Sequence, residues 1–413
     1  MCLYIIQPDA PQPNLNIMNF NIEEYLDSLS SDVKTIDISR KNITFIPCLY
    51  RFKKLEGLYC DNNQLISLPS LPPTLIYLHC GYNQLASLPP LPPTIMELHC
   101  QHNKMVSLPK LSIKMVVLYC GCNKLNSLPL LSPKLLYLQC QCNYLSSLPP
   151  LPPTIIMMHC QYNQLTSLPP LPLNMIILHC QSNKITYIPE LHSRLEGINC
   201  GGNQLTCLPP LPSYLKELSC YNNQLTILPT LPSKLKLLYC EDNQLTSLPT
   251  LPSTIKLLNC EYNQLTRLPM LPPKITDFNC SGNRLTCLPQ LPPKLQYLYC
   301  CENQLTCLPR LPESITHLSY WSNPIYYICV NGHDNGGFYD HNHDISDVND
   351  KNRIIHNFRF LYYSLRYKKR FRDLLWIKVR EPRIMNHYSP ANLVILLEGV
   401  DGQTEFDEKL SKW

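Results

Sequence analysis

Leucine and isoleucine recur along most of this 413-residue chain in a pattern with a period of twenty residues. Residues 75–89 read LIYLHCGYNQLASLP, and residues 95–109 read IMELHCQHNKMVSLP. A cysteine stands at every twentieth position from Cys60 to Cys300, and an asparagine follows three residues after each of them. A short fixed period predicts a repeat architecture, in which each unit packs against its neighbours.

One part of the repeat alternates as a β-strand does. In L-x-x-L-x-C the second leucine and the cysteine are separated by variable residues, so Leu78 and Cys80 are expected to point inward and Tyr77 and His79 outward. The asparagine falls where the strand ends, and a buried amide there has donors and acceptors for the backbone of the turn. The L-P-x-L-P run that follows predicts an extended, polyproline-like return, because proline fixes φ and lacks a backbone donor.

The full unit, L-x-x-L-x-C-x-x-N-x-L-T-x-L-P-x-L-P-x-x, resembles the leucine-rich repeat of the short twenty-residue type. This type is known from bacterial effectors and from the proteins of mimivirus-like giant viruses. The resemblance covers residues 33–325. It implies a repeat solenoid of about fifteen turns with one short parallel β-strand per turn, an asparagine ladder, and a concave face that binds a protein partner.

The N-terminal segment, residues 1–32, is predicted to end in a helix that covers the first turn. Asn21 is a good N-cap and acidic residues follow it, so a helix is expected from about Ile22 to Leu29. The first repeat is degenerate. Lys41 takes the asparagine position, and the step to the next unit is twenty-two residues instead of twenty.

The composition changes after the solenoid. Residues 326–352 are rich in glycine, asparagine and aspartate and are predicted to be a linker. Residues 353–413 place apolar side chains at helical spacing around a basic cluster at 366–372, which predicts a C-terminal basic helical segment and a second helical cap.

The composition, above all the cysteine content, indicates the cellular compartment of the protein. The net charge is only +5, and most of the 40 prolines fall in register with the repeat. Thirteen of the 22 cysteines form the column from Cys60 to Cys300, which we interpret as buried thiols of the core, with metal or disulfide chemistry as the alternative. So many unpaired thiols favour a reducing compartment, and no signal peptide or transmembrane run is visible, so we expect an intracellular protein of the host cytoplasm.

The variable outward positions are rich in tyrosine and histidine, which offer a large contact area with a polar tip. The alternative is a solvated sheet face with favourable cross-strand pairs. The predicted partner-binding residues are Tyr77, His79, Tyr82, His99, Tyr119, Tyr137, His159, Tyr162, His179, Tyr239, Tyr262, Tyr297 and Tyr299.

Three groups have metal-ligand chemistry, but none is predicted to be a metal site. His79 and His99 share a column on adjacent strands, as do His159 and His179, and no third ligand is evident from the sequence. The C-x-C pairs at 120–122 and 140–142 have one residue between the cysteines where zinc motifs have two to four. The run DHNHD at 340–344 lies in the predicted linker, where such residues gather by chance.

These features favour a non-enzymatic protein-interaction scaffold without a cofactor or a small-molecule substrate. The ubiquitin-ligase domain of some effectors with this repeat does not fit, because Cys329 is the only cysteine after the last repeat. No phosphate-binding glycine loop or nucleophile elbow is present. The alternative is an adaptor whose basic C-terminal helix docks on a membrane or on nucleic acid, with the repeats as a spacer.

Overall fold

The computed structural model of the chain describes residues 20–325. The predicted linker at 326–352 and the predicted basic helical segment at 353–413 lie outside these residues, as do residues 1–19. The described residues contain one helix, α1 (Ile22–Ser28), and fifteen strands of three residues each. The strands are β1 (Thr35–Asp37), β2 (Gly57–Tyr59), β3 (Tyr77–His79), β4 (Glu97–His99), β5 (Val117–Tyr119), β6 (Tyr137–Gln139), β7 (Met157–His159), β8 (Ile177–His179), β9 (Gly197–Asn199), β10 (Glu217–Ser219), β11 (Leu237–Tyr239), β12 (Leu257–Asn259), β13 (Asp277–Asn279), β14 (Tyr297–Tyr299) and β15 (His317–Ser319).

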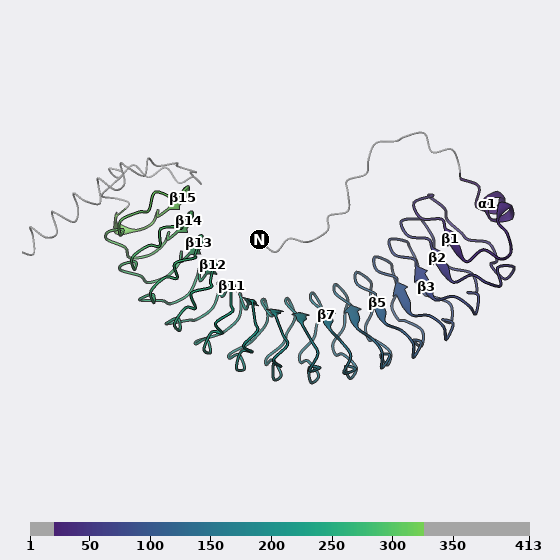
Figure 1. The fold of residues 1–413 in the computed structure, drawn as a ribbon, viewed down its shortest axis with the longest axis horizontal. Helices are drawn as coiled ribbons and strands as arrows, with labels where there is room; N and C mark the ends of the chain where they lie inside the picture. The colour runs from purple at the N-terminus through teal and green to yellow at the C-terminus, as the bar shows by residue number, and fades with distance from the viewer. Residues whose placement is uncertain (1–19, 326–413) are drawn as a thin grey trace, which may run out of the picture. The chain divides into compact units, whose positions relative to one another are not determined.

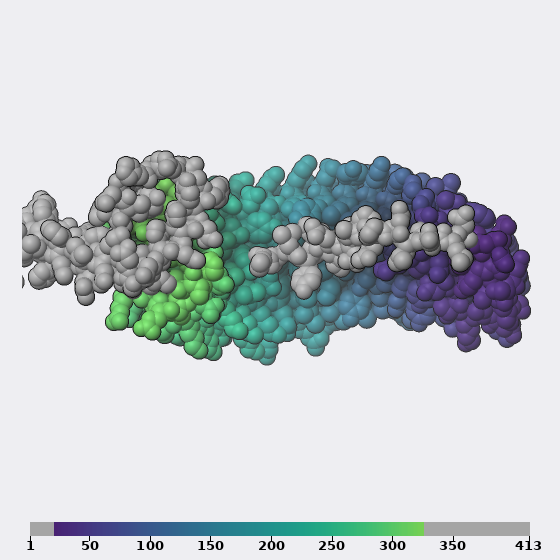
Figure 2. Space-filling view, turned by 90° about the horizontal axis from the view of Figure 1, so that it is seen from above, coloured from purple at the N-terminus to yellow at the C-terminus, as the bar shows by residue number. Residues whose placement is uncertain are grey.

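The strands form one parallel sheet whose order follows the sequence from β1 to β15. The chain makes one turn per repeat, and Figure 1 shows the strands along the inner, concave side of the stacked turns. Figure 2 shows the turns following one another without a break from the purple N-terminal ones to the green C-terminal ones. The predicted repeat solenoid with parallel strands is therefore confirmed.

The register of the sheet equals the sequence period. Leu78 of β3 pairs with Leu98 of β4, twenty residues later, whereas Ile36 of β1 pairs with Leu58 of β2, twenty-two residues later. The longer first step predicted from the sequence is thus absorbed between β1 and β2 without a shift of register. Equivalent side chains of neighbouring turns consequently stand side by side throughout the sheet.

The core is a set of columns that run through the turns. Within one repeat Leu75, Leu78, Cys80 and Leu85 have no exposed surface, and the same positions are buried in the following turns up to that of β14. The predicted inward position of the cysteines is confirmed, since all thirteen column cysteines are buried free thiols. Burial raises the pKa of these thiols, to about 12 at Cys140 and Cys200.

The asparagine ladder is the second set of columns. In the turn of Asn143, Nδ2 donates to the carbonyl oxygens of Cys120 and Cys140, both at 3.1 Å. Oδ1 of the same side chain accepts from the backbone N–H of Leu125 at 2.9 Å. Each asparagine therefore ties its own turn to the preceding one, and it satisfies backbone groups that would otherwise be buried without partners.

Lys41 at the asparagine position of the first turn fits this geometry. Each asparagine bonds the turn that precedes its own, so Asn63 bonds the first turn. Its Nδ2 donates to the carbonyl oxygen of Ile38 at 2.8 Å, and its Oδ1 accepts from the N–H of Lys41 at 3.0 Å. No described turn precedes the first one, and an asparagine at position 41 would have no earlier turn to bond. The last asparagine, Asn323, is fully buried and bonds the carbonyl oxygen of Cys300 at 2.8 Å.

A left-handed residue follows each strand. The residue two positions after the column cysteine has positive φ in every turn from Asn62 to Ser322, and it is glycine only at Gly202 and Gly282. At Tyr82, where φ is 54°, the N–H donates to the carbonyl oxygen of Gln101 in the next turn at 2.9 Å. The left-handed conformation costs a non-glycine residue about 1 kcal/mol, and the ladder of backbone bonds holds it in place.

Helix α1 agrees with the predicted helix to within one residue. The Oδ1 atom of Asn21 accepts from the N–H groups of Glu23 and Glu24 at 3.1 and 3.2 Å, so Asn21 is the predicted N-cap. Ile22 and Leu26 of α1 are buried. The Arg51 guanidinium of the first repeat pairs with Asp27 at 2.8 Å and donates to the carbonyl oxygen of Leu26.

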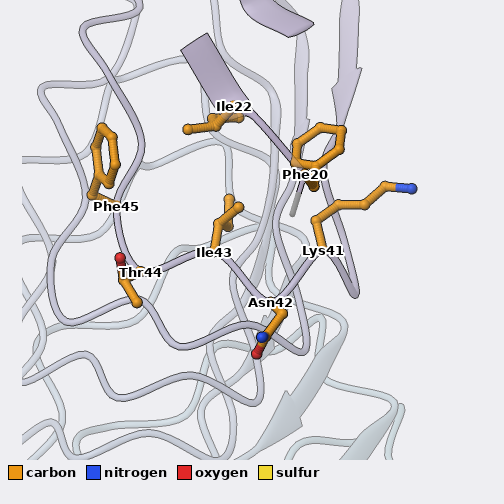
Figure 3. A pocket seen from close by; sticks show the side chains of 7 residues that line it. All are labelled: Phe20, Ile22, Lys41, Asn42, Ile43, Thr44 and Phe45. Atoms are coloured by element: carbon orange, nitrogen blue, oxygen red, sulfur yellow. The ribbon is translucent and has the colours of Figure 1, made fainter. Parts of the chain in front are cut away.

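A shallow hollow of about 200 Å³ lies where α1 meets the first turn (Figure 3). Phe20, Ile22 and residues 41–45 line it, and the Lys41 ammonium group lies 5.4 Å from the centre of the Phe20 ring. Apart from the Lys41 ammonium group, the lining side chains carry no group suited to catalysis or metal binding. We therefore assign this hollow to the packing of the N-terminal end.

Replacing Asn143 by alanine is expected to destabilise the protein by about 2–4 kcal/mol, because the N–H of Leu125 and the Cys120 carbonyl lose a buried partner. The change is measured as the free energy of unfolding in urea. Asn126→Ala is the matched control, since Asn126 is exposed and alanine already stands at the equivalent position 86. Equal stability of the two variants would contradict a structural role of the ladder.

The column thiols are expected to resist alkylation in the native protein, because they are buried and the thiolate is the reactive form. A maleimide should modify the exposed Cys48, Cys207 and Cys287 and leave Cys140 and Cys160 unmodified until denaturant is added. Peptide mapping by mass spectrometry identifies each site. Modification of Cys140 in native protein would contradict the packing described for the core.

Candidate functional site

The outward face of the N-terminal strands carries a continuous stack of four rings. The ring of His79 on β3 lies parallel to that of His99 on β4, with 3.8 Å between the ring centres and 14° between the planes. Tyr119 of β5 stacks on His99 at 4.5 Å, and Tyr59 of β2 contacts His79 edge-on at 4.7 Å. This ring stack of Tyr59, His79, His99 and Tyr119 spans four consecutive turns.

Shorter stacks occur elsewhere along the array. His159 of β7 lies parallel to His179 of β8 with 4.5 Å between the ring centres. Tyr82 stacks on His102 at 4.2 Å. The cause is the same in each case: in-register parallel strands are about 4.8 Å apart, a separation at which flat side chains in one column make ring contacts.

The thirteen predicted partner-binding residues fall into two groups, one in the strands and one in the turns that follow them. Ten lie in strands, at the first or third residue. The other three, Tyr82, Tyr162 and Tyr262, lie in the left-handed turn position that follows a strand. Tyr162 is 50% exposed and Tyr262 is 46% exposed, whereas most strand residues of the set are half-buried against one another.

The structure brings only part of this set together. Tyr137 of β6 is flanked in its column by Val117 and Met157, so its column supplies no ring on either side, and it interacts electrostatically with Tyr119 of the other strand column. Gln139 separates Tyr119 from His159 in the other strand column. The predicted aromatic surface is therefore a series of separate clusters.

Burial and a neighbouring histidine lower the pKa of two of the stacked histidines. Burial, and then the charge of His79, lowers the pKa of His99 to about 4. Burial, and then His179, lowers the pKa of His159 to about 4. A neutral imidazole keeps a lone pair on one ring nitrogen, which is the form that accepts hydrogen bonds and binds metals.

A carboxylate joins one histidine pair, which sequence reasoning missed. Glu97 of β4 lies diagonally across from His79, with 3.9 Å between its Oε2 and the Nε2 of His79. His79, Glu97 and His99 each offer one ligand atom, and these atoms lie within 4.8 Å of one another. The signal was present in the sequence, because Glu97 precedes His99 by two residues and therefore shares its face.

The two C-x-C pairs are not chelating units. Cys120 and Cys140 are buried in the core, while Cys122 and Cys142 lie in left-handed positions outside it. The thiols of Cys122 and Cys142 hydrogen-bond to each other across neighbouring turns, and this bond lowers the pKa of Cys142 to about 7. The run at 340–344 lies outside the described residues.

Acidic and amide side chains join the rings in the later turns. Nδ2 of Asn279 donates to Glu261 at 2.7 Å. Burial, opposed in part by a bond from its own backbone N–H, and then the charges of Asp242 and Glu261, raise the pKa of Glu241 to about 7. The Oε2 atom of Glu241 is buried and has no hydrogen-bond partner among the described residues. Within residues 20–325, no helix has the length and apolar character needed to cross a membrane.

Comparison with known proteins identifies the class. The solved structure of YopM, a leucine-rich effector protein of Yersinia pestis, is 30% identical, with a TM-score of 0.61 over 70% of this chain and 88% of that one. The chain belongs to the leucine-rich repeat proteins, as the sequence resemblance predicted.

Two more distant structures share the fold. A leucine-rich repeat protein of Leptospira interrogans is 22% identical, with a TM-score of 0.50 over 74% of this chain and 93% of that one. The functional domain of InlJ from Listeria monocytogenes, which includes a cysteine ladder, is 20% identical, with a TM-score of 0.50 over 67% of this chain and 60% of that one. A scan of protein-family models and a search of curated proteins found no match.

Glu241→Gln is expected to stabilise the protein more at pH 8 than at pH 5. Because the folded pKa is raised from 4.5 to about 7, the folded state holds the proton more tightly and loses stability as pH rises through this window. The gain in the free energy of unfolding on Glu241→Gln substitution is expected to be about 2 kcal/mol larger at pH 8 than at pH 5.

Glutamine is a conservative choice at this site, since it occupies the equivalent positions 101, 141, 161 and 181. Glu190→Gln is the control, because Glu190 is exposed. If both variants change equally with pH, the raised pKa of Glu241 is wrong.

Proposed function

We propose that this chain is a non-enzymatic scaffold that binds a protein partner through the concave face of its repeats. The observation that carries the proposal is the concentration of tyrosine and histidine in columns on the strand face, over many consecutive turns. Rigid rings of this kind provide contact area at a low cost in side-chain entropy, and they are enriched where proteins bind proteins.

The similarity to known proteins supports this reading. YopM is an effector protein, and it covers most of the described repeats at 30% identity. By analogy, the chain would act on proteins of a host cell, in the host cytoplasm. A viral origin belongs to the same proposal and rests on the resemblance of the repeat unit to that of giant-virus proteins. Helical caps at both ends and a polyproline-like convex side belong to the same proposal.

The partner-binding face includes all thirteen residues predicted from the sequence, and three of them suit a test. Tyr77 and Tyr137 begin strands β3 and β6, and Tyr162 follows β7. Replacing these three tyrosines together by alanine is expected to weaken partner capture at least about tenfold, since buried interface tyrosines each commonly contribute more than 1 kcal/mol. Capture from a host-cell lysate by the full chain is compared with capture by the variant.

A matched control replaces three exposed tyrosines that lie outside the strands, Tyr144, Tyr187 and Tyr214. This variant should keep the partner. Circular dichroism verifies that both variants are folded. Unchanged capture by the strand-face variant, or equal loss in both, would exclude the concave face as the binding surface.

The adaptor alternative makes a different prediction for salt. Contact of the basic cluster at 366–372 with a membrane or nucleic acid would weaken steeply as ionic strength rises. A surface of neutral rings would respond weakly. Repeating the capture at two salt concentrations therefore separates the two functions.

A further inference from the structure

The inference concerns one site on the concave face, formed by His79, Glu97 and His99. Strands β3 and β4 pair with His79 opposite His99 and Tyr77 opposite Glu97. Glu97 is thus on the same face as both histidines, and its carboxylate reaches His79 diagonally across the strand pair. Two imidazoles and one carboxylate with ligand atoms within 4.8 Å of one another are a donor set typical of transition-metal sites.

One ligand atom of this cluster has no hydrogen-bond partner in the described part of the chain that would explain its position. The Nε2 atom of His79 is buried and has no hydrogen-bond partner within residues 20–325. Its distance to Oε2 of Glu97, 3.9 Å, is too long for a hydrogen bond. This separation is somewhat longer than the roughly 3.3 Å between two atoms that bind the same tetrahedral zinc ion, so a small approach of the side chains would suit a shared metal.

The surroundings favour a cation. Tyr59 packs edge-on against His79, and Tyr119 stacks on the far side of His99, so rings enclose the pair along the column. Asp61 lies close enough to His79 for an electrostatic interaction. The carboxylates of Asp37, Asp61 and Glu97 also interact electrostatically with Tyr59. This end of the strand face is accordingly negative.

The second histidine pair shows what is special about the first. His159 and His179 stack in the same way, with 4.5 Å between ring centres and 15° between planes. The residue that corresponds to Glu97 there is Ile177, which offers no ligand. The chain therefore contains a natural comparison that has the histidines but lacks the carboxylate.

We propose that His79, Glu97 and His99 bind one divalent transition-metal ion of the zinc class, with the remaining coordination positions open toward solvent. The two rings are now nearly parallel, so at least one of them turns out of the stack for both lone pairs to meet the ion. Three ligands about 2.0–2.1 Å from zinc lie roughly 3.3 Å apart, so the side chains also draw closer together. The site does not depend on the proposed partner-binding function.

The test measures Zn²⁺ binding to the full-length protein in two ways. Equilibrium dialysis counts the ions bound and gives their affinities, and NMR follows the imidazole resonances as Zn²⁺ is added. Accessible thiols such as Cys142 bind zinc as well, but they are the same in every variant and do not move histidine resonances. Glu97→Gln keeps the size of the side chain and removes the negative ligand.

Wild-type protein is expected to bind one more Zn²⁺ than Glu97→Gln, or to bind it at least about tenfold more tightly, since loss of even an outer-shell partner commonly costs that much. The resonances of His79 and His99 should shift in the wild type. His99→Asn should show the same loss of zinc as Glu97→Gln. The control, His159→Asn combined with His179→Asn, should bind zinc as the wild type does.

Equal zinc binding by the wild type, Glu97→Gln and His99→Asn would overturn the proposal. It would also fail if the His159 and His179 control lost the same ion, because the metal would then bind histidines without regard to the carboxylate. Thermal unfolding in the absence of metal verifies that each variant is folded, so a loss of zinc reports on ligands and not on misfolding.

Discussion

The buried asparagine amide is the interaction on which the rest of the molecule depends. A turn of twenty residues with a three-residue strand leaves many backbone groups without partners inside its own repeat. The amide of Asn143 joins four of them, from two turns, at distances near 3 Å. Because every turn is held to its neighbour by the same contact, the register stays constant, and side chains at one repeat position become columns.

Constant register gives the strand face two chemically different parts. In the first turns the columns hold rings, which stack at ring-contact distances from Tyr59 to Tyr119. In later turns Glu241 and Glu261 follow the column cysteines and Asn279 ends a strand, and burial makes the two carboxylates harder to ionise. One continuous sheet thus carries a ring stack in its first turns and, farther along, rings interspersed with acidic and amide side chains.

Much of this could be predicted from the sequence, because the period alone specifies which residues are equivalent. The inward cysteines, the asparagine ladder, the twenty-two-residue first step and the N-cap at Asn21 all follow from spacing and residue type. The thirteen candidate surface residues were chosen by composition, and their role stays a prediction. A ladder of hydroxyl bonds, such as Thr94 Oγ1 to the carbonyl oxygen of Leu75 at 2.6 Å, went unnoticed because threonine there also fits an ordinary turn.

Contacts between side chains of different columns could not be predicted from the repeat pattern. The approach of Glu97 to His79 depends on diagonal distances and side-chain rotamers, which the period leaves undetermined. The same holds for the bond between the Cys122 and Cys142 thiols, since the C-x-C spacing suggests a pair within one turn and the structure forms it between turns. Tyr137 shows the converse, because its neighbours within its own column, Val117 and Met157, carry no rings.

The backward reach of the asparagines gives the array a polarity. Lys41 in the first turn and the fully buried Asn323 in the last described one show that the two ends are not equivalent. Turns resemble monomers of a polymer that join head to tail in a single orientation. Adding or removing a whole unit keeps this orientation, and each such unit changes the spacing between two surface clusters by one strand separation. Partners of different lengths could be matched in this way without redesign of any single turn.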